Sequence, residues 1–563
     1  MKITFVLRFL LILPILFTAC KKQVIQTDKI ETPELSPSFA IPLGYANLNL
    51  GDVERRFDGQ ELVFNQANQL FELVYQRSIF EFTAADYFQF ATQNFSDSYS
   101  APPSVATAIN VGGAGATASW QEQLVNTLSF SNSESIDSVL INTGNLTINV
   151  NSEFSHDISI NLSSPYIVSP AGSTFNTTID LDYQGMAPLS EFITLDLSGY
   201  TIDFTRNGTT TNEIELNATL FITSSGAPIT GSENITFAST VNLTDYAAVY
   251  GYFGQFTTNL NGQTDIASFY ENFNGGTLSF ADPRLELFLF NTTGIEVATD
   301  FSAIFELADN SNVINSGAGL TNIPNLAPAL FVGDTAVTTH QINNGNTNPT
   351  LTNMLNQAPT EIVFATNSTV NPTGIATNFL TKESKVWARA NAVLPFFGYA
   401  DNFSLNDTTD LDLAEELALS PQDNFTVEDV EKLTVRIITK NGLPVTGNVQ
   451  LYFADSLGAV IDSLFTTYQN GENIIQGAPI NTSLPISDPN YGKVTNSVEK
   501  TTDIVLTGQK LKSLIDQGSK KLIYSLKANT TDASNQTDIK FFPEYDLFIK
   551  VSAKIDFKLN LQQ

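Results

Sequence analysis

Short runs in which apolar and polar residues alternate recur along most of the chain. In Asn145–Val150 the apolar residues occupy every second position, and Glu215–Ile222 repeats the alternation. Successive side chains of a strand point to opposite faces, so such runs are typical of strands with one buried face. Clusters of Asp, Asn, Gly and Thr separate them. This pattern predicts an all-β protein of tandem antiparallel β-sandwiches, immunoglobulin-like in class, with few short helices.

A strand–turn–strand unit occurs three times, with turn asparagines at Asn151, Asn291 and Asn441. The similar spacing favours one unit in each of several sandwiches. We expect a signal peptide over 1–19, a lipidated tether over 20–38, an N-terminal β-rich region over 39–130, and sandwiches over 131–280, 281–385 and 386–563, the last with a short helix near 506–517.

The first twenty residues have the features of a secretory signal. Lys2 and Arg8 are followed by an apolar stretch that ends at Phe17 and is too short to span a membrane as a helix. The run Leu16–Cys20 resembles the lipobox of bacterial lipoproteins and ends on the single cysteine of the chain. The resemblance implies lipidation of Cys20 and cleavage before it, so that acyl chains on Cys20 attach the protein to a membrane.

Composition limits the partners and cofactors. The chain has 58 acidic and 27 basic residues and a net charge of −31, which argues against nucleic acid as a partner. Hydrophobic residues make up 42 % of the chain, enough for folded domains rather than disorder. No cofactor motif is present in the sequence, and we expect no cofactor.

The sequence offers little support for catalysis. Two histidines lie far apart, and no zinc-protease or serine-hydrolase motif accompanies them. The densest acidic cluster includes Asp407, Asp410 and Asp412. These are weak calcium candidates, and paired carboxylates are also what a glycosidase uses, but a solvated acidic turn explains them more simply. We therefore expect no catalytic residue and no metal site.

Aromatic side chains are the better candidates for ligand contact, since their rings stack on the apolar faces of sugars; core packing is the competing interpretation. The candidates are the two tryptophans and the densest aromatic cluster, Trp120, Trp387, Phe396, Phe397 and Tyr399.

Several segments together resemble a group of Bacteroidota lipoproteins with no established activity. They are Ser38–Leu43 with Leu48, Leu50, Gly51 and Asp52, Leu197–Asp203, Tyr250–Gly254, Asp282-Pro283 and Asn441–Pro444. The resemblance covers most of the chain after Cys20, and its motifs are structural rather than catalytic. Four hydroxyls also match the Asp-Ser/Thr-apolar pattern that resembles an O-glycosylation signal of exported Bacteroidota proteins: Ser138, Thr335, Ser456 and Ser463.

Location is suggested by the residues after the cysteine. Lys21 and Lys22 stand where surface-exported lipoproteins of this phylum often carry acidic residues, and no aspartate directly follows Cys20. Both features favour the outer membrane, with the domains facing the periplasm. We expect a lipid-anchored, non-catalytic envelope protein with a binding or structural role, whose partner is a glycan or an envelope protein. The alternatives are a glycan-active enzyme with paired carboxylates and a carrier of an apolar ligand such as lipid.

Replacing the lipidated residue tests the anchor. A Cys20→Ser protein should lose labelling by a radioactive fatty acid and move from the membrane to the soluble fraction, because the thiol is the attachment point. A variant that stays acylated and membrane-bound would contradict the assignment.

Overall fold

The computed structural model describes, by residue number, 34–35, 38–50, 62–86, 88–131, 133–259, 262–265, 275–307, 312–357, 359–411, 427–465 and 471–560. Antiparallel sheets form most of this part of the chain, which confirms the predicted all-β sandwich fold. None of the described helices is long and apolar enough to cross a membrane. Cys20 and the signal segment lie outside the described residues. Among the described residues, the helices, including 3-10 turns, are η1 (Ala84–Asp86), α4 (Pro103–Gly112), α6 (Ala318–Thr321), α7 (Leu351–Leu355), η2 (Val427–Asp429), α9 (Gly508–Asp516) and η3 (Ala533–Asn535).

The sheets form three sandwiches, which we call distal, middle and basal. The distal sandwich has two facing layers, with strand orders β10-β7-β13-β5 and β9-β8-β12-β6. Strand β11 pairs with both β7 and β8 and so joins the layers. Buried residues of the two layers share one hydrophobic core. The strands are β5 (Gln93–Ser100), β6 (Thr117–Thr127), β7 (Ser135–Ser152), β8 (Asp157–Val168), β9 (Thr174–Leu181), β10 (Leu189–Asp196), β11 (Thr201–Asp203), β12 (Glu213–Thr223) and β13 (Asn234–Tyr252).

The middle sandwich places the sheet β20-β17-β23-β4-β3 against a sheet in which β21 pairs with β14, β15 and β18, and β18 pairs with β19. A short strand, β22 (Asn378–Leu380), pairs with β13 of the distal sandwich. The strands are β3 (Leu62–Asn65), β4 (Leu70–Thr83), β14 (Phe256–Thr258), β15 (Gly262–Asp265), β17 (Arg284–Asn291), β18 (Val297–Leu307), β19 (Asn312–Asn315), β20 (Ala336–Asn343), β21 (Pro359–Val370) and β23 (Lys385–Pro395).

The basal sandwich contains strands from both ends of the described chain, β2 and β33. Its sheets have the orders β2-β33-β26-β30 and β25-β31-β27-β28, with β29 also on β27. A small sheet, β16-β24-β32, and the pair β1-β34 complete the described strands. The bounds are β1 (Glu34–Leu35), β2 (Ser38–Asn49), β16 (Thr277–Phe280), β24 (Phe397–Asp401), β25 (Phe403–Asp410), β26 (Val430–Asn441), β27 (Val445–Ala454), β28 (Val460–Ser463), β29 (Glu472–Ile475), β30 (Val498–Thr507), β31 (Lys521–Thr530), β32 (Ile539–Lys540), β33 (Asp546–Phe557) and β34 (Leu559–Asn560).

The three sandwiches repeat one strand topology. A central strand (β7, β17 or β26) lies between two later strands, which are β10 and β13, β20 and β23, or β30 and β33. The strand that follows it crosses to the other layer as β8, β18 or β27 and pairs there with β12, β21 or β31. These central and crossing strands are the strand–turn–strand units that the sequence repeats.

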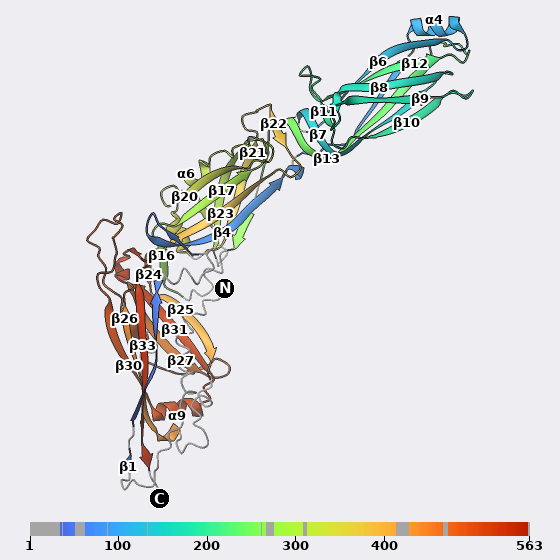
Figure 1. Ribbon diagram of the computed structural model, residues 1–563. Helices are drawn as coiled ribbons and strands as arrows, with labels where there is room; N and C mark the ends of the chain where they lie inside the picture. The colour runs from blue at the N-terminus through green and yellow to red at the C-terminus, as the bar shows by residue number, and fades with distance from the viewer. Residues whose placement is uncertain are drawn as a thin grey trace.

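The sandwiches are nested in the chain rather than simply consecutive. The outgoing chain contributes β2 to the basal, β4 to the middle and β5 to the distal sandwich, and the returning chain supplies their partners β33, β23 and β13. Figure 1 shows the sandwiches in a row, with α4 at one end and β1 near the C-terminus at the other. The strands of the predicted region 39–130 are therefore divided among all three sandwiches, because alternation indicates which face is buried but not which strand is the neighbour.

The repeated turn has a common buried polar residue. Ser152, Asn291 and Asn441 end the central strands and are all fully buried. Each accepts the backbone N–H two residues later, at 3.2, 2.8 and 2.9 Å. In the distal copy this residue is Ser152 rather than the expected Asn151, which is exposed. A side chain that bonds its own backbone stabilises the turn between layers.

Asn291 provides a test of this turn. Its Nδ2 donates to the carbonyls of Ile295 and Ala327 at 2.7 and 3.1 Å. Asn291→Ala should lower the free energy of unfolding of the middle sandwich by about 2–3 kcal/mol, because buried backbone groups lose their partners. Urea titration in a Trp120→Phe background reports on this sandwich through Trp387, the remaining tryptophan.

The matched control is Asn151→Ala, read through Trp120 in a Trp387→Phe background. Since Asn151 is exposed, its loss should change the free energy of unfolding by less than about 0.5 kcal/mol. Equal losses at the two positions would disprove the proposed role of the buried turn residue.

Candidate functional site

The outer face of the basal sheet β2-β33-β26-β30 carries the most accessible aromatic side chain of the described residues. Along β2, Ala46 is buried whereas Tyr45 is 75 % exposed. Along β33, Leu547 is buried and Phe548 alternates with it. Tyr45 and Phe548 therefore lie on the side away from the core. We call this surface, formed by Tyr45, Phe548, Lys440, Lys550 and Arg436, the Tyr45 face.

Tyr45 and Phe548 form a stacked pair. Their ring centroids are 6.0 Å apart and the ring planes meet at 30°. Phe548 supports one side of the Tyr45 ring, while the large exposed fraction leaves the other side open to solvent. An open, backed aromatic ring provides an apolar surface on which a flat ligand can stack.

Cationic side chains surround this aromatic pair. Lys550 is directly opposite Tyr45 in the register of β2 and β33, and Lys440 is directly opposite Phe548 in that of β26 and β33. Residues in such positions have Cβ atoms about 4.5–5.5 Å apart. Both lysines are exposed, and neither forms an ion pair with another described residue. Arg436 is engaged by Asp503, at 2.7 Å from each of two guanidinium nitrogens.

Trp387, a candidate from the sequence, lies on the outer face of the middle sandwich, but its ring is already in use. Phe290 stacks on it at 4.8 Å with an interplanar angle of 7°, and the Nζ of Lys385 lies 4.9 Å from the ring centroid. Arg389 continues the series over Phe288 and Phe290, at 5.1 and 5.4 Å. Cation–π and cross-strand contacts of this kind stabilise the sheet, so the half-buried Trp387 ring already has partners within the middle sandwich.

Trp120 and the cluster around Phe396 also have packing roles. Trp120 is only 7 % exposed and meets Phe154 edge to face in the distal core. Phe396 packs against buried Phe71, where the outgoing and returning chains meet at the base of the middle sandwich.

Phe397 and Tyr399 lie in β24, and Tyr399 pairs with Ser279 of β16. The Nζ of Lys540 lies 5.5 Å from the centroid of the Phe397 ring and donates to the carbonyl of Asp488 at 2.7 Å. Burial lowers the pKa of this lysine, and a neighbouring carboxylate, Asp488, partly opposes the effect. Phe397 thus packs against a small core at the junction between sheets, and Tyr399 is half-buried two residues further along the same strand.

The acidic candidates do not come together as a site among the described residues. Asp407 and Asp410 lie in β25, where Asp410 is exposed, and Asp412 lies outside the described part of the chain. Within that part, no group of three or more His, Asp and Glu side chains is arranged to hold a metal ion. His156 is buried, and burial lowers its pKa; its Nδ1 accepts the backbone N–H of Ser225 at 3.1 Å.

The four hydroxyls in the O-glycosylation pattern differ in access. Thr335 and Ser456 are exposed outside the strands. Ser138 is half-buried in β7, between β13 and β11. Ser463 is 5 % exposed and donates to the carbonyl of Phe465 at 2.9 Å. A folded protein thus presents only Thr335 and Ser456 openly to a modifying enzyme.

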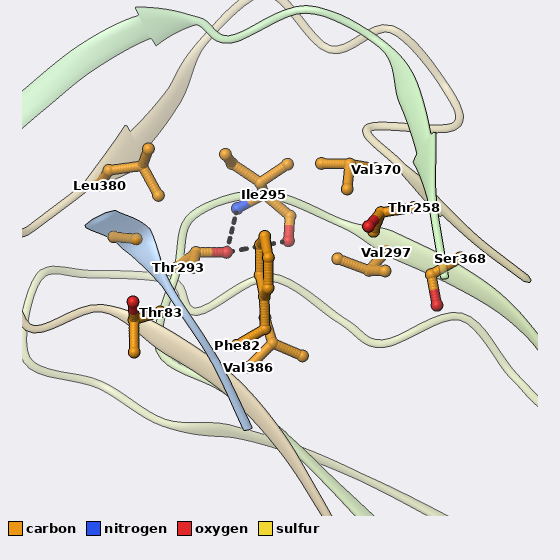
Figure 2. Close-up of a pocket in the computed structure, with 11 residues that line it drawn as sticks. Phe82, Thr83, Thr258, Thr293, Ile295, Val297, Ser368, Val370, Leu380 and Val386 are labelled. Carbon is orange, nitrogen blue, oxygen red and sulfur yellow. Dashed lines mark hydrogen bonds between the residues drawn. The ribbon is translucent and has the colours of Figure 1, made fainter. Parts of the chain in front are cut away.

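One apolar cavity opens near the junction of the middle and distal sandwiches (Figure 2). Its volume is about 20 Å³, room for a single water, whereas pockets for small organic ligands measure roughly 300–1,000 Å³. Thr293 beside it uses its hydroxyl to donate to the carbonyl of Ile295 and to accept that residue's N–H, at 3.2 and 3.1 Å. The cavity is too small for the apolar ligand that a lipid carrier would hold.

No protein-family model and no curated protein matches the chain. Among solved structures, a protein described as secreted from Parabacteroides distasonis aligns over 63 % of this chain and 99 % of its own, with 12 % identity and a TM-score of 0.19. The PBSX exported protein XepA aligns over 53 % and 86 %, with 8 % identity and a TM-score of 0.13. A CBM22 tandem domain from Paenibacillus barcinonensis Xyn10C aligns over 50 % and 92 %, with 8 % identity and a TM-score of 0.14. These values are too low to transfer a property to this chain.

The sequence interpretation missed Tyr45 as a ligand candidate. The segment Tyr45–Leu50 does alternate, and a tyrosine on its polar side was the available signal. Its importance depends on Phe548 and Lys550, which are brought beside it only by the pairing of β2 with β33.

Proposed function

We propose that this protein is a lipid-anchored, non-catalytic binding protein of the bacterial envelope that binds a glycan on the Tyr45 face. The observation that supports this most directly is the 75 % exposure of Tyr45, stacked on Phe548 at the surface of a regular sheet. A sugar ring has an apolar face of C–H groups that fits on such an aromatic surface, and hydroxyl groups at its rim remain in water.

Attachment through Cys20 would keep this face close to the membrane. The segment from Cys20 to Glu34 reaches at most about 50 Å when fully extended. Glu34 lies in β1, which pairs with β34 beside the basal sandwich. The proposed anchor is therefore joined to the sandwich that carries Tyr45, and the middle and distal sandwiches extend from it (Figure 1). We place the protein on the periplasmic face of the outer membrane.

The rigid support of Tyr45 suits binding without chemistry. Strand β2 is held along its length by β33, so the platform is formed before a ligand arrives and little ordering entropy is lost on binding. Tyr45 stacks on Phe548 and lies opposite Lys550, and the Asp503 carboxylate on the same face is held by Arg436 rather than free to act on a glycosidic bond. The proposal thus includes binding of the glycan intact.

Removing the Tyr45 ring tests the platform. On a glycan microarray, the protein without its signal segment should bind at least one class of saccharide, and Tyr45→Ala should weaken that binding by about tenfold, or ~1.4 kcal/mol. Tyr45→Phe should retain most of it, because the ring remains. Incubation should release no reducing sugar from the bound glycan.

Trp387→Ala is the matched control, because it removes a larger ring that already contacts Phe290 and Lys385. Its binding should equal that of the unchanged protein. An array without any bound saccharide, or equal weakening by Tyr45→Ala and Trp387→Ala, would rule out the Tyr45 platform.

A further inference from the structure

The charges around Tyr45 indicate which glycans fit this face. Exposed Lys440 lies opposite Phe548 in the register of β26 and β33, and exposed Lys550 lies two residues after Phe548 on β33. No described carboxylate forms an ion pair with either one. Two unpaired cations beside an open ring form a site for a ligand that combines a flat apolar surface with negative charge.

We infer that the glycan bound on the Tyr45 face is an acidic polysaccharide, with carboxylates that pair with Lys440 and Lys550 while one of its sugar rings stacks on Tyr45. This inference rests on the proposed function and names its ligand class. Lys440 and Lys550 then determine specificity, and Tyr45 supplies stacking that is common to neutral and acidic sugars.

The local charge, rather than the net charge of −31, decides whether an acidic polymer can approach. At physiological salt the Debye length is about 8 Å, so most of the distant carboxylates are screened. On the face itself, Asp503 is neutralised by Arg436, and Asp556 pairs with Lys554 at 2.7 Å. Two other carboxylates share the face. Glu499 stands opposite Lys440 in the register of β26 and β30, at the far side of that lysine from Phe548. Asp546, half-buried, lies two residues before Phe548 on β33, on the side away from Lys550.

At an exposed position, lysine suits the binding of a flexible acidic polymer better than arginine does. A flexible ammonium group adapts to a carboxylate on a mobile polymer and forms a salt-sensitive contact, whereas arginine fixes a planar geometry, as Arg436 does with Asp503. Because Lys440 and Lys550 project into water, their contribution should decrease steadily as salt increases.

The test compares polygalacturonate with the same polymer after its carboxylates have been reduced to alcohols. In affinity electrophoresis or calorimetry, the protein without its signal segment should bind polygalacturonate about tenfold more tightly than the reduced polymer, and salt should diminish this preference. Lys440→Gln/Lys550→Gln should abolish the preference and leave binding to the reduced polymer unchanged.

The control double variant is Lys521→Gln/Lys527→Gln, on β31 of the opposite sheet. It removes the same charge from the same sandwich and should keep the preference. A Tyr45→Ala protein that still binds polygalacturonate with full affinity would show simple ion exchange and overturn the inference.

The outcomes separate the two proposals. Equal binding of both polymers overturns the acidic-ligand inference but leaves glycan binding in place. Binding of neither polymer also overturns it, and an empty glycan array then removes the proposed function as well. A Lys440→Gln/Lys550→Gln protein that keeps its preference for polygalacturonate shows that other residues recognise the charge.

Discussion

Pairing between β2 and β33 joins the first and last long strands of the described chain, and the arrangement of all three sandwiches depends on such pairings. Closing a loop costs more as the loop grows, although each doubling adds only about 0.6 kcal/mol. The nested order keeps the two strands of each pair close in space, because the chain leaves a sandwich, forms the next one, and returns beside the strand from which it left. Phe88 and Phe253 lie on the outgoing and returning chains of the distal sandwich. Both are buried, and their ring centroids are 5.2 Å apart. Phe71 and Phe396 meet in the same way below the middle sandwich.

The candidate site follows from that same constraint. Tyr45 comes from the outgoing chain, and Phe548 and Lys550 come from the last long strand. A shift of one residue in the pairing of β2 with β33 would turn Tyr45 toward the core and Ala46 toward solvent. The buried alternate positions therefore fix the register that places the ring beside its supporting phenylalanine and the lysines. Fold stability and the geometry of the proposed binding face rest on one set of backbone hydrogen bonds.

Two aromatic groups on outer sheet faces show how similar residues take different roles. Trp387 stacks on Phe290 and has the Lys385 ammonium over its ring, and both partners belong to the middle sandwich. Tyr45 has one ring neighbour, and the other side of its ring faces water. Residue type does not separate a structural ring from a binding ring. The neighbours on adjacent strands distinguish the two roles. Phe290 beside Trp387 and Phe548 beside Tyr45 both come from segments far away in the sequence.

Local patterns in the sequence determined much of the secondary structure. Alternation in Asn145–Val150 and Glu215–Ile222 predicted strands that the structure contains as parts of β7 and β12, and the asparagines at 291 and 441 marked the turns between layers. The short helix expected near 506–517 is α9, whose Leu511 and Leu514 are buried. These features depend on neighbours a few residues apart, whose geometry the backbone imposes directly. Tertiary structure alone decided the nested order, the packing of Trp120 and Phe396, and the placement of Phe548 and Lys550 beside Tyr45. An alternating strand exposes the same hydrogen-bonding edge to any partner, so only the competition of all strands for one core selects its neighbours.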